Sequence, residues 1–397
     1  MIYIFIIIIL VLLSIHYDIH GNTKGKKFCI RLVLFVFIMM AGLRYRIGID
    51  TIRYIGKFYN VYPYLWELSW DDFSIGSDPL FMLLNSIVKS IGCRFYVVQI
   101  LHALFVNLLI FNYVRKHSKY IFTFLLFYFV IFYYGYNADV MRASMSIVVC
   151  LYANDFILQK NYVKGFLLYL IGCLFHISTV LLLVTPLLFK LKLNYLSLCI
   201  GAFIFVLSGF VQDFLTDNIA LLLNIDIVYG KLDGYIEQEE NLNDKLNILG
   251  YIFKIIPCIY PVLYLLWLKY KRKESGLLCF EPIVTVGVLF AIATLRVPLL
   301  YRYVDFYLVY FYIIDAHLFV EMVKSYSREI NIISIVRPVV IFVPLFFVTY
   351  KSWKDLYLYD VVLPYSSVIE RSVDEERERV YEKEHNLSRY DYPFNKY

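Results

Sequence analysis

FCIRLVLFVFIMMAGLRYRIGIDTIRY, residues 28–54, joins a long apolar run to a short segment crowded with charge. The first part, 28–43, has the composition of a helix that crosses a membrane. The second part, 44–54, holds three arginines and an aspartate at the predicted membrane edge. A simple anchor does not need these charges, and a soluble loop does not need the aliphatic residues between them. The stretch therefore predicts a membrane protein with polar chemistry at one face.

The composition of the whole chain supports this class. Of 397 residues, 61% are hydrophobic, and the mean hydropathy is +0.66. A soluble domain of this length could not bury so much apolar surface. The 38 tyrosines suit membrane–water interfaces, where the ring is apolar and the hydroxyl stays hydrated. We therefore predict an all-α fold, a polytopic transmembrane helical bundle with about 10–12 spans.

Charge and cysteine content exclude several classes. The net charge of +6 is modest, and the basic residues lie in short loops between apolar runs, so nucleic acid is not an expected partner. The seven cysteines show no CxxC spacing, so neither a disulfide framework nor a metal site is indicated. The first residues, MIYIFIIIILVLLSI, lack a basic leader and a small-residue cleavage site and are expected to form a retained first span.

Candidate spans follow from the apolar runs, and the positive-inside rule orients them. The runs are about 1–16, 28–43, 95–113, 120–135, 140–158, 195–212, 247–268, 277–295, 302–320 and 332–350. Six basic clusters lie between them, at Lys24/Lys26/Lys27/Arg31, Arg115/Lys116/Lys119, Lys160/Lys164, Lys190/Lys192, Lys269/Lys271/Arg272/Lys273 and Lys324/Arg328. All six can be cytoplasmic only if the stretch 164–189 goes out and comes back. We favour two short segments with His176 at the outer turn, the alternative being one helix.

This threading defines the expected domain organisation. Residues 1–350 form a transmembrane domain with a large outer loop at 44–94 and an outer acidic loop at 213–246. Within the first loop, residues 78–92 are expected to form an interfacial amphipathic helix or a partial insertion. Residues 351–397 form a charged extramembrane tail, in which 369–385 have helical composition but no apolar face and are expected to be exposed or disordered.

Unusual polar residues then fall on the outer side. They come from four separated stretches, and together they would form a basic, partly dehydrated cleft with one histidine and several carboxylates. The set comprises Arg44, Arg46, Asp50, Arg53, Asn137, Asp139, Arg142, His176, Ser178, Arg296, Arg302 and Asp305.

Each of these residues also has a structural explanation. Arginines at the ends of spans usually extend to lipid head groups, and a lone histidine in an apolar run is more often a core residue. Asp50 could form an ordinary i,i+4 pair with Arg46, although Gly48 between them favours a turn. The pair Asp71-Asp72 is weak support for a divalent cation. The structural explanation would have to apply separately to each of the four stretches on the same face. This coincidence keeps the functional interpretation open.

Several motifs resemble the EpsG family of Wzy-like membrane proteins that assemble exopolysaccharide and O-antigen. They are RYRIGIDTIRY (44–54), NADVMRAS (137–144), LFHISTV (174–180) and RYVDFY (302–307), with LPYSSVI (363–369) in the tail. No phosphate-binding G-x-x-x-x-G-K-[ST], G-x-S-x-G or HExxH motif is present. The resemblance follows the chain in order over nearly its whole length.

The resemblance implies polymerisation of lipid-linked oligosaccharide repeat units at the outer face of the plasma (inner) membrane, in exopolysaccharide, O-antigen or capsule synthesis. The substrate would be an oligosaccharide on polyprenyl pyrophosphate, within membrane lipid, with other polysaccharide-assembly proteins as partners and no cofactor. Arginine forks suit the pyrophosphate leaving group, and a positioned base suits the acceptor hydroxyl. We expect Arg46, Arg142, His176 and Asp50 to be catalytic, with His176 the first choice for the base. Substrate-binding residues would be Arg44, Tyr54, Asn137, Ser178, Arg302 and Tyr303.

Other functions remain open from the sequence. A membrane glycosyltransferase that adds one sugar from a polyprenyl monophosphate could use Asp50 or Asp71-Asp72. An acyltransferase could use His176. A flippase for the same lipid-linked unit would also need an arginine-lined cavity, but it would present that cavity to both sides of the membrane.

Overall fold

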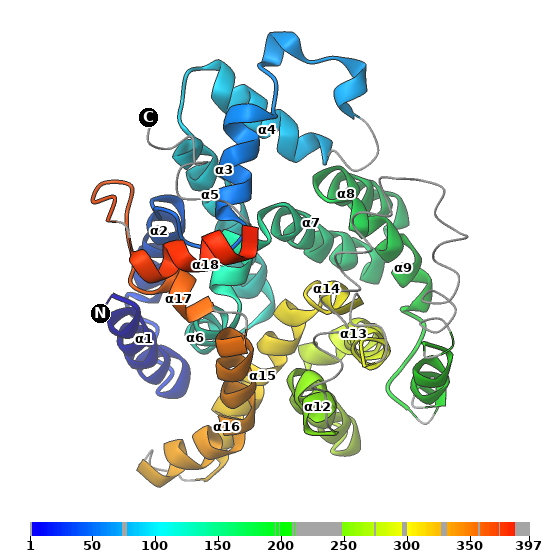
Figure 1. Ribbon diagram of the computed structural model, residues 1–397. Coiled ribbons are helices and arrows are strands. Elements are labelled where there is room, and N and C mark those ends of the chain that lie inside the picture. Colours follow the sequence, from blue (N-terminus) through cyan, green and yellow to red (C-terminus); the bar gives the residue numbers. More distant parts are fainter. Residues whose placement is uncertain are drawn as a thin grey trace. The chain divides into compact units, whose positions relative to one another are not determined.

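The computed structural model describes residues 2–73, 78–194, 196–197, 199–208, 210, 248–273, 275–295, 300–326, 332–355, 358–372 and 374–385. Within these ranges every regular element is a helix, and the one strand-like feature is an isolated antiparallel bridge between Arg44 and Ser367 (Figure 1). This confirms the predicted all-α fold. The acidic loop 213–246 and residues 386–397 of the predicted tail lie outside the described residues.

The chain forms two compact units, and each is described separately. The first comprises Met1–Leu183, Val323–Ser334 and Thr349–Tyr397, and the second comprises Val184–Met322 and Ile335–Val348. Helices of the first unit are α1 (Ile2–Leu13), α2 (Lys26–Gly42), α3 (Thr51–Asn60), α4 (Pro79–Ser90), α5 (Phe95–His117), α6 (Ile121–Ile131), α7 (Met141–Leu158), α8 (Tyr162–Phe175), α17 (Leu358–Val362) and α18 (Glu375–His385).

The second unit contains α9 (Thr185–Leu188), α12 (Ile248–Tyr270), α13 (Glu281–Ala293) and α14 (Tyr301–Val304). Two helices, α15 (Leu308–Tyr326) and α16 (Ile332–Asp355), contribute residues to both units. The predicted span 302–320 begins later than expected, because Tyr301–Val304 forms a separate turn and the long helix starts at Leu308.

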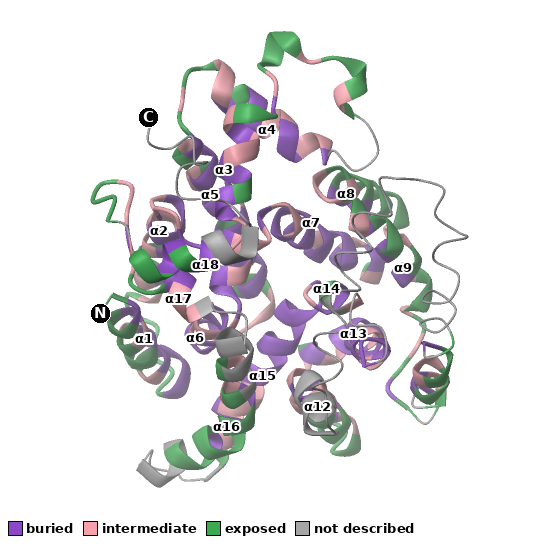
Figure 2. Ribbon diagram, viewed as in Figure 1, coloured by how far each residue is buried: buried purple, intermediate pink, exposed green. Residues whose placement is uncertain are grey.

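Four helical segments among the described residues are long and apolar enough to cross a membrane. They are Ile2–Ile19, Phe95–His117, Met141–Leu158 and Gly276–Ala293, and shorter apolar helices accompany them. The outward face of α1 is apolar, since Ile4, Phe5 and Leu12 are each at least 60% exposed (Figure 2). Such an apolar face is suited to contact with lipid. A helix also makes its backbone hydrogen bonds internally, which the membrane interior requires. The protein is therefore a multi-pass membrane protein.

Glycines allow close approach between the helices that carry the site. Gly42 of α2 lies against α5, where an added Cβ would sit 2.9 Å from the Cα of Ile100. Gly165 and Gly172 of α8 face α7, and a Cβ on either would meet α7 atoms at 3.1 Å or less. Small residues at helix contacts are typical of membrane bundles, because packing replaces the hydrophobic effect as the force between helices.

The stretch 164–189 is broken at His176. Helix α8 ends at Phe175, His176 is extended, and a 3₁₀ segment runs over Ile177–Val184. The Thr179 methyl group lies 3.3 Å from the Cβ position of Gly172, whereas residues seven apart in a straight helix are separated by about 10.5 Å along its axis. The chain therefore folds back here, as the two-segment interpretation expected.

The expectation for the tail is wrong in one respect. Helix α18 has an apolar face, because Val380 and Tyr381 pack with Ile52 and Val361 in a buried cluster. In the segment ERVYEKE, residues 378–384, five of the seven residues are charged, and the adjacent Val380 and Tyr381 supply the buried face of this short helix. The described part of the tail is thus docked on the first unit.

Candidate functional site

The loop that follows α2 is held by a fully buried arginine. Arg44 is 1% exposed, and its guanidinium donates to the carbonyl oxygens of Ile47 (3.3 Å) and Ala41 and to the sulfur of Met141 (3.3 Å). The Ala41 carbonyl is one of the last in α2 and has no partner within the helix. Burial lowers the pKa of Arg44 to about 10. Arg44 therefore supports the loop, although the sequence suggested a substrate contact.

A glycine brings this loop against the turn before α7. Gly48 has φ +107°, a conformation that favours glycine, and a Cβ there would lie 2.6 Å from that of Ala138 and 2.8 Å from Asp139 Oδ1. The Tyr54 hydroxyl donates to the Asp139 carbonyl at 3.0 Å. Gly48 lies in the bend that precedes α3, as predicted, and Asp50 pairs with Arg53 at 3.5 Å. The motifs 44–54 and 137–144 are therefore in direct contact.

One buried carboxylate connects the two best candidates for catalysis. Asp78, 2% exposed, forms an ion pair with Arg142, and its Oδ1 lies 3.5 Å from His176 Nδ1. The same Oδ1 accepts a hydrogen bond from the backbone N–H of Ile177 at 3.0 Å. Burial alone raises the pKa of Asp78, but His176 and Arg142 outweigh it and hold that pKa below its usual value. Asp78 is thus an ionised anchor for a guanidinium and an imidazole.

The three side chains of this cluster, Asp78, Arg142 and His176, come from different elements. Asp78 precedes α4 with Pro79 at the first helical position, a frequent helix start. Arg142 lies in the first turn of α7, and His176 follows α8 at the fold-back. The side chains of Arg142 and His176 remain 27% and 16% exposed, so both can meet a ligand.

Tyrosines surround the Arg142 guanidinium. It lies 5.8 Å from the centre of the Tyr54 ring, within the range of a cation–π contact. Burial raises the pKa of Tyr62 to about 12, and it raises that of Tyr54 as well. Both phenols are therefore neutral at physiological pH and can donate hydrogen bonds.

The remaining predicted residues have other surroundings. Asn137 is 1% exposed and bonded within the bundle to Asn107, Tyr128 and the Tyr133 carbonyl, at 2.8–3.1 Å. Ser178 is half-buried, two residues after His176. Arg302 and Tyr303 belong to the second unit, where Arg302 is exposed and Tyr303 stacks on Phe290. Arg296 lies outside the described residues.

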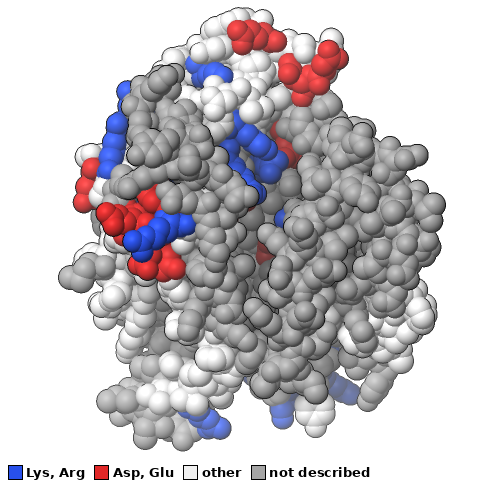
Figure 3. All heavy atoms as spheres, in the orientation of Figure 1, with Lys and Arg blue, Asp and Glu red and all other residues white. Residues whose placement is uncertain are grey.

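Two contributors were missed by the sequence analysis. Asp78 was seen only as the start of a helix, and Glu378 only as part of a charged tail. Glu378 pairs with Arg46 at 2.8 Å, with side chains 8% and 10% exposed. In Figure 3, basic and acidic side chains gather over the part of the first unit that carries α3, α4 and α18. Among the described residues, no group of three or more His, Cys, Asp or Glu side chains is placed to hold a metal ion.

Within the first unit, the predicted cytoplasmic clusters lie at the other end of the helices that carry the site. Lys26 donates to the Lys119 carbonyl (3.1 Å), Lys116 pairs with Asp155 (2.7 Å), and Lys324 lies 4.7 Å from the Tyr120 ring. Arg142 lies in the first turn of α7 and Asp155 near its end, so about 20 Å along the helix axis separates the two groups.

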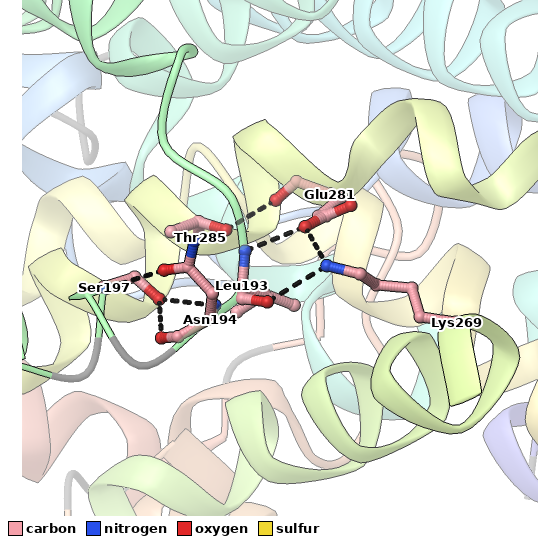
Figure 4. A network of polar contacts seen from close by, with 6 residues as sticks. All are labelled: Leu193, Asn194, Ser197, Lys269, Glu281 and Thr285. Carbon is pink, nitrogen blue, oxygen red and sulfur yellow. Dashed lines mark hydrogen bonds and ion pairs between the residues drawn. The ribbon is translucent and has the colours of Figure 1, made fainter.

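The second unit shows the same grouping of predicted cytoplasmic loops. Lys269 Nζ lies 2.8 Å from Glu281 Oε1 and donates to the Leu193 carbonyl at 3.0 Å (Figure 4). Glu281 also accepts from the Leu193 N–H at 2.8 Å. These bonds place the loop after Lys192 beside the one after Lys269. Glu281 is therefore a structural ion-pair residue.

Comparison with known proteins adds one finding. No curated protein and no solved structure matches the chain. The model of the EpsG family matches residues 27–367, a range that includes Arg44, Asp78, Arg142 and His176, all of the second unit and most of the first. Because this match covers most of its length, the chain belongs to the EpsG family.

Proposed function

We propose that the protein is a polysaccharide polymerase that joins lipid-linked oligosaccharide units at the outer face of the plasma membrane. The family supports polymerisation of exopolysaccharide. The observation that carries the mechanism is the shared carboxylate of Asp78, which orients Arg142 and His176 toward one partly exposed site.

The geometry suits glycosyl transfer from a pyrophosphate donor. An acceptor hydroxyl attacks the anomeric carbon of the donor glycan, and the bond from that carbon to the pyrophosphate oxygen breaks. The hydroxyl proton passes to His176 Nε2, since Nδ1 faces Asp78. The electron pair of the broken bond goes to the pyrophosphate, where Arg142 stabilises the charge. A base oriented by a third group is a recurrent catalytic arrangement.

The other predicted residues take supporting roles in this proposal. Ser178, two residues after His176, would donate a hydrogen bond to the glycan. Tyr54 supports Arg142 through its ring, because its hydroxyl proton is donated to the Asp139 carbonyl. Arg44 and Asn137 are buried, and they stabilise the loop after α2 and the turn before α7. Asp50, with a side chain 37% exposed, remains the second candidate for the base. Arg302 and Tyr303, which belong to the second unit, remain predicted substrate-binding residues.

The length of the glycan polymer made by site variants tests the proposal. Arg142→Ala and His176→Ala are expected to reduce polymerisation by about 10²-fold or more, because each removes a group used in the transition state. Gels of the surface glycan should show single repeat units in place of a ladder, at normal protein levels. Arg94→Ala, in the predicted outer loop, is the matched control. A full ladder from both site variants would contradict the proposal, and one added sugar in the wild type would favour the single-sugar enzyme.

A further inference from the structure

Helix α18 lies beyond the range matched by the family, yet it is built into the site-bearing end of the first unit. The match ends at residue 367, and α18 begins at Glu375. Three of its polar or charged side chains are closed to solvent: Arg377 is 1%, Glu378 6% and Tyr381 0% exposed. A solvated charged tail would not bury an arginine and a glutamate.

All three side chains act on one short loop. The Glu378 carboxylate lies 2.8 Å from the Arg46 guanidinium. The Tyr381 hydroxyl oxygen lies 2.7 Å from the carbonyl of Arg46 and 3.0 Å from that of Gly48, so one proton serves both. Arg377 donates to the Tyr45 carbonyl at 3.5 Å and to that of Pro364. The loop 45–48 is thus bound through its backbone carbonyls and through the side chain of Arg46.

The loop needs such support. Arg46 has φ +52°, which is uncommon for a residue with a side chain, and Gly48 has φ +107°. Conformations of this kind persist only when the surroundings hold them. The loop in turn supports the catalytic residue, because Gly48 and Ile49 pack on Ala138 and Asp139, three residues before Arg142.

We infer that α18 is a positioning element of the active site, with Arg46 acting through its ion pair to Glu378 and not on the substrate. The chain of contacts runs from Glu378 and Tyr381 through loop 45–48 to the turn that precedes Arg142. Arg46 is 10% exposed and already faces a carboxylate, whereas Arg142 offers the more accessible guanidinium. This inference rests on the proposed function, since it assumes that Arg142 serves the transfer.

A charge swap tests the role of Arg46. Arg46→Glu and Glu378→Arg should each lower the rate of polymerisation on the order of tenfold to a hundredfold, because each leaves a buried like-charge pair. The double variant restores an ion pair and should recover most of the wild-type rate. A well-folded double variant as inactive as Arg46→Glu alone would show that the substrate needs Arg46, and would overturn the inference.

Tyr381→Phe provides a second test that does not depend on the swap folding. The ring stays packed on Ile52, and only the hydroxyl is lost. We expect a lower kcat with an unchanged KM for the lipid-linked oligosaccharide, and faster hydrogen exchange in residues 44–54. Tyr152→Phe, which loses a 3.0 Å bond to the Leu109 carbonyl, is the matched control and should change neither. Wild-type kcat and exchange in Tyr381→Phe would refute a positioning role for α18, whereas absence of any polymer from the wild type would refute the proposed function itself.

Discussion

At the scale of single residues, Asp78 brings an arginine and a histidine from distant stretches of the chain to one carboxylate. Asp78→Asn keeps the size of the side chain but removes the charge that faces Arg142 and His176. We expect the rate of polymerisation to fall by about 10²–10⁴-fold, the range that a positioned base contributes. Asp72→Asn is a suitable control, because the Asp72 carboxylate lies in an exposed loop, where it accepts hydrogen bonds from the backbone N–H and the hydroxyl of Ser69.

The effects of Asp78 and His176 should not add. Residues that work as one unit lose most of their contribution with the first substitution. The double variant Asp78→Asn/His176→Ala is therefore expected to be no more than a fewfold slower than His176→Ala. Initial rates of the four proteins, compared as a double-mutant cycle, measure this coupling. Fully multiplicative losses would mean that the two residues act independently.

Asp139 gives the first unit a pH-dependent stability. Burial, and then the charge of Asp50, raise the pKa of Asp139 to about 7. A carboxyl group with a raised folded-state pKa stabilises the fold at low pH, and this contribution is lost as the pH rises from about 4 to about 7. Asp139→Asn should flatten the fall in Tm between pH 5 and pH 8 in detergent, while Glu370→Gln, at an exposed site, should not. If Asp139→Asn keeps the wild-type change of Tm with pH, another group must cause that pH dependence.

At the scale of elements, the contact between α2 and α5 depends on the lack of a side chain at Gly42. In Gly42→Ala the new Cβ would lie 2.9 Å from the Cα of Ile100, and backbone cannot move aside as a flexible side chain can. We expect a destabilisation of about 1–3 kcal/mol, seen as a lower Tm. The matched substitution Gly56→Ala, in α3, meets nothing within 4 Å and should be neutral or stabilise by about 0.5–1 kcal/mol. Equal effects of the two substitutions would argue against close packing of α2 on α5.

The helices were the part of the structure that the sequence predicted best. A helix that crosses a membrane needs a long apolar run, and this requirement does not depend on which helices pack beside it. The break at His176 also followed, since the basic loops had to share one side. The docking of α18 did not, because two apolar residues in a charged tail give no periodic signal. The partners of Arg142 and Arg46 were equally hidden, being 64 and 332 positions away in the sequence. Several carboxylates could have served each arginine, and only the folded chain selects one.

At the scale of the whole molecule, each unit separately supports the orientation deduced from charge. In the first unit, three lysines contact residues at the end of α7 that is far from Arg142, or near that end. The contacts are Lys26 with Lys119, Lys116 with Asp155, and Lys324 with Tyr120. In the second unit, Lys269 joins Leu193. These local groupings are what the positive-inside rule requires if all the basic loops face the cytoplasm.

Cysteine labelling in intact cells tests that orientation directly. In a variant whose seven native cysteines are replaced, Trp70→Cys places a thiol in the predicted outer loop, at a position 92% exposed. Lys160→Cys places one at the exposed end of α7 that bears the basic clusters. We expect a membrane-impermeant maleimide to label position 70 in whole cells and position 160 only after permeabilisation. Both variants must still make polymer, so that labelling reports the native topology. The reverse pattern would put the Asp78 site in the cytoplasm, where it would meet donors before they cross the membrane, and polymerisation at the outer face would then be impossible.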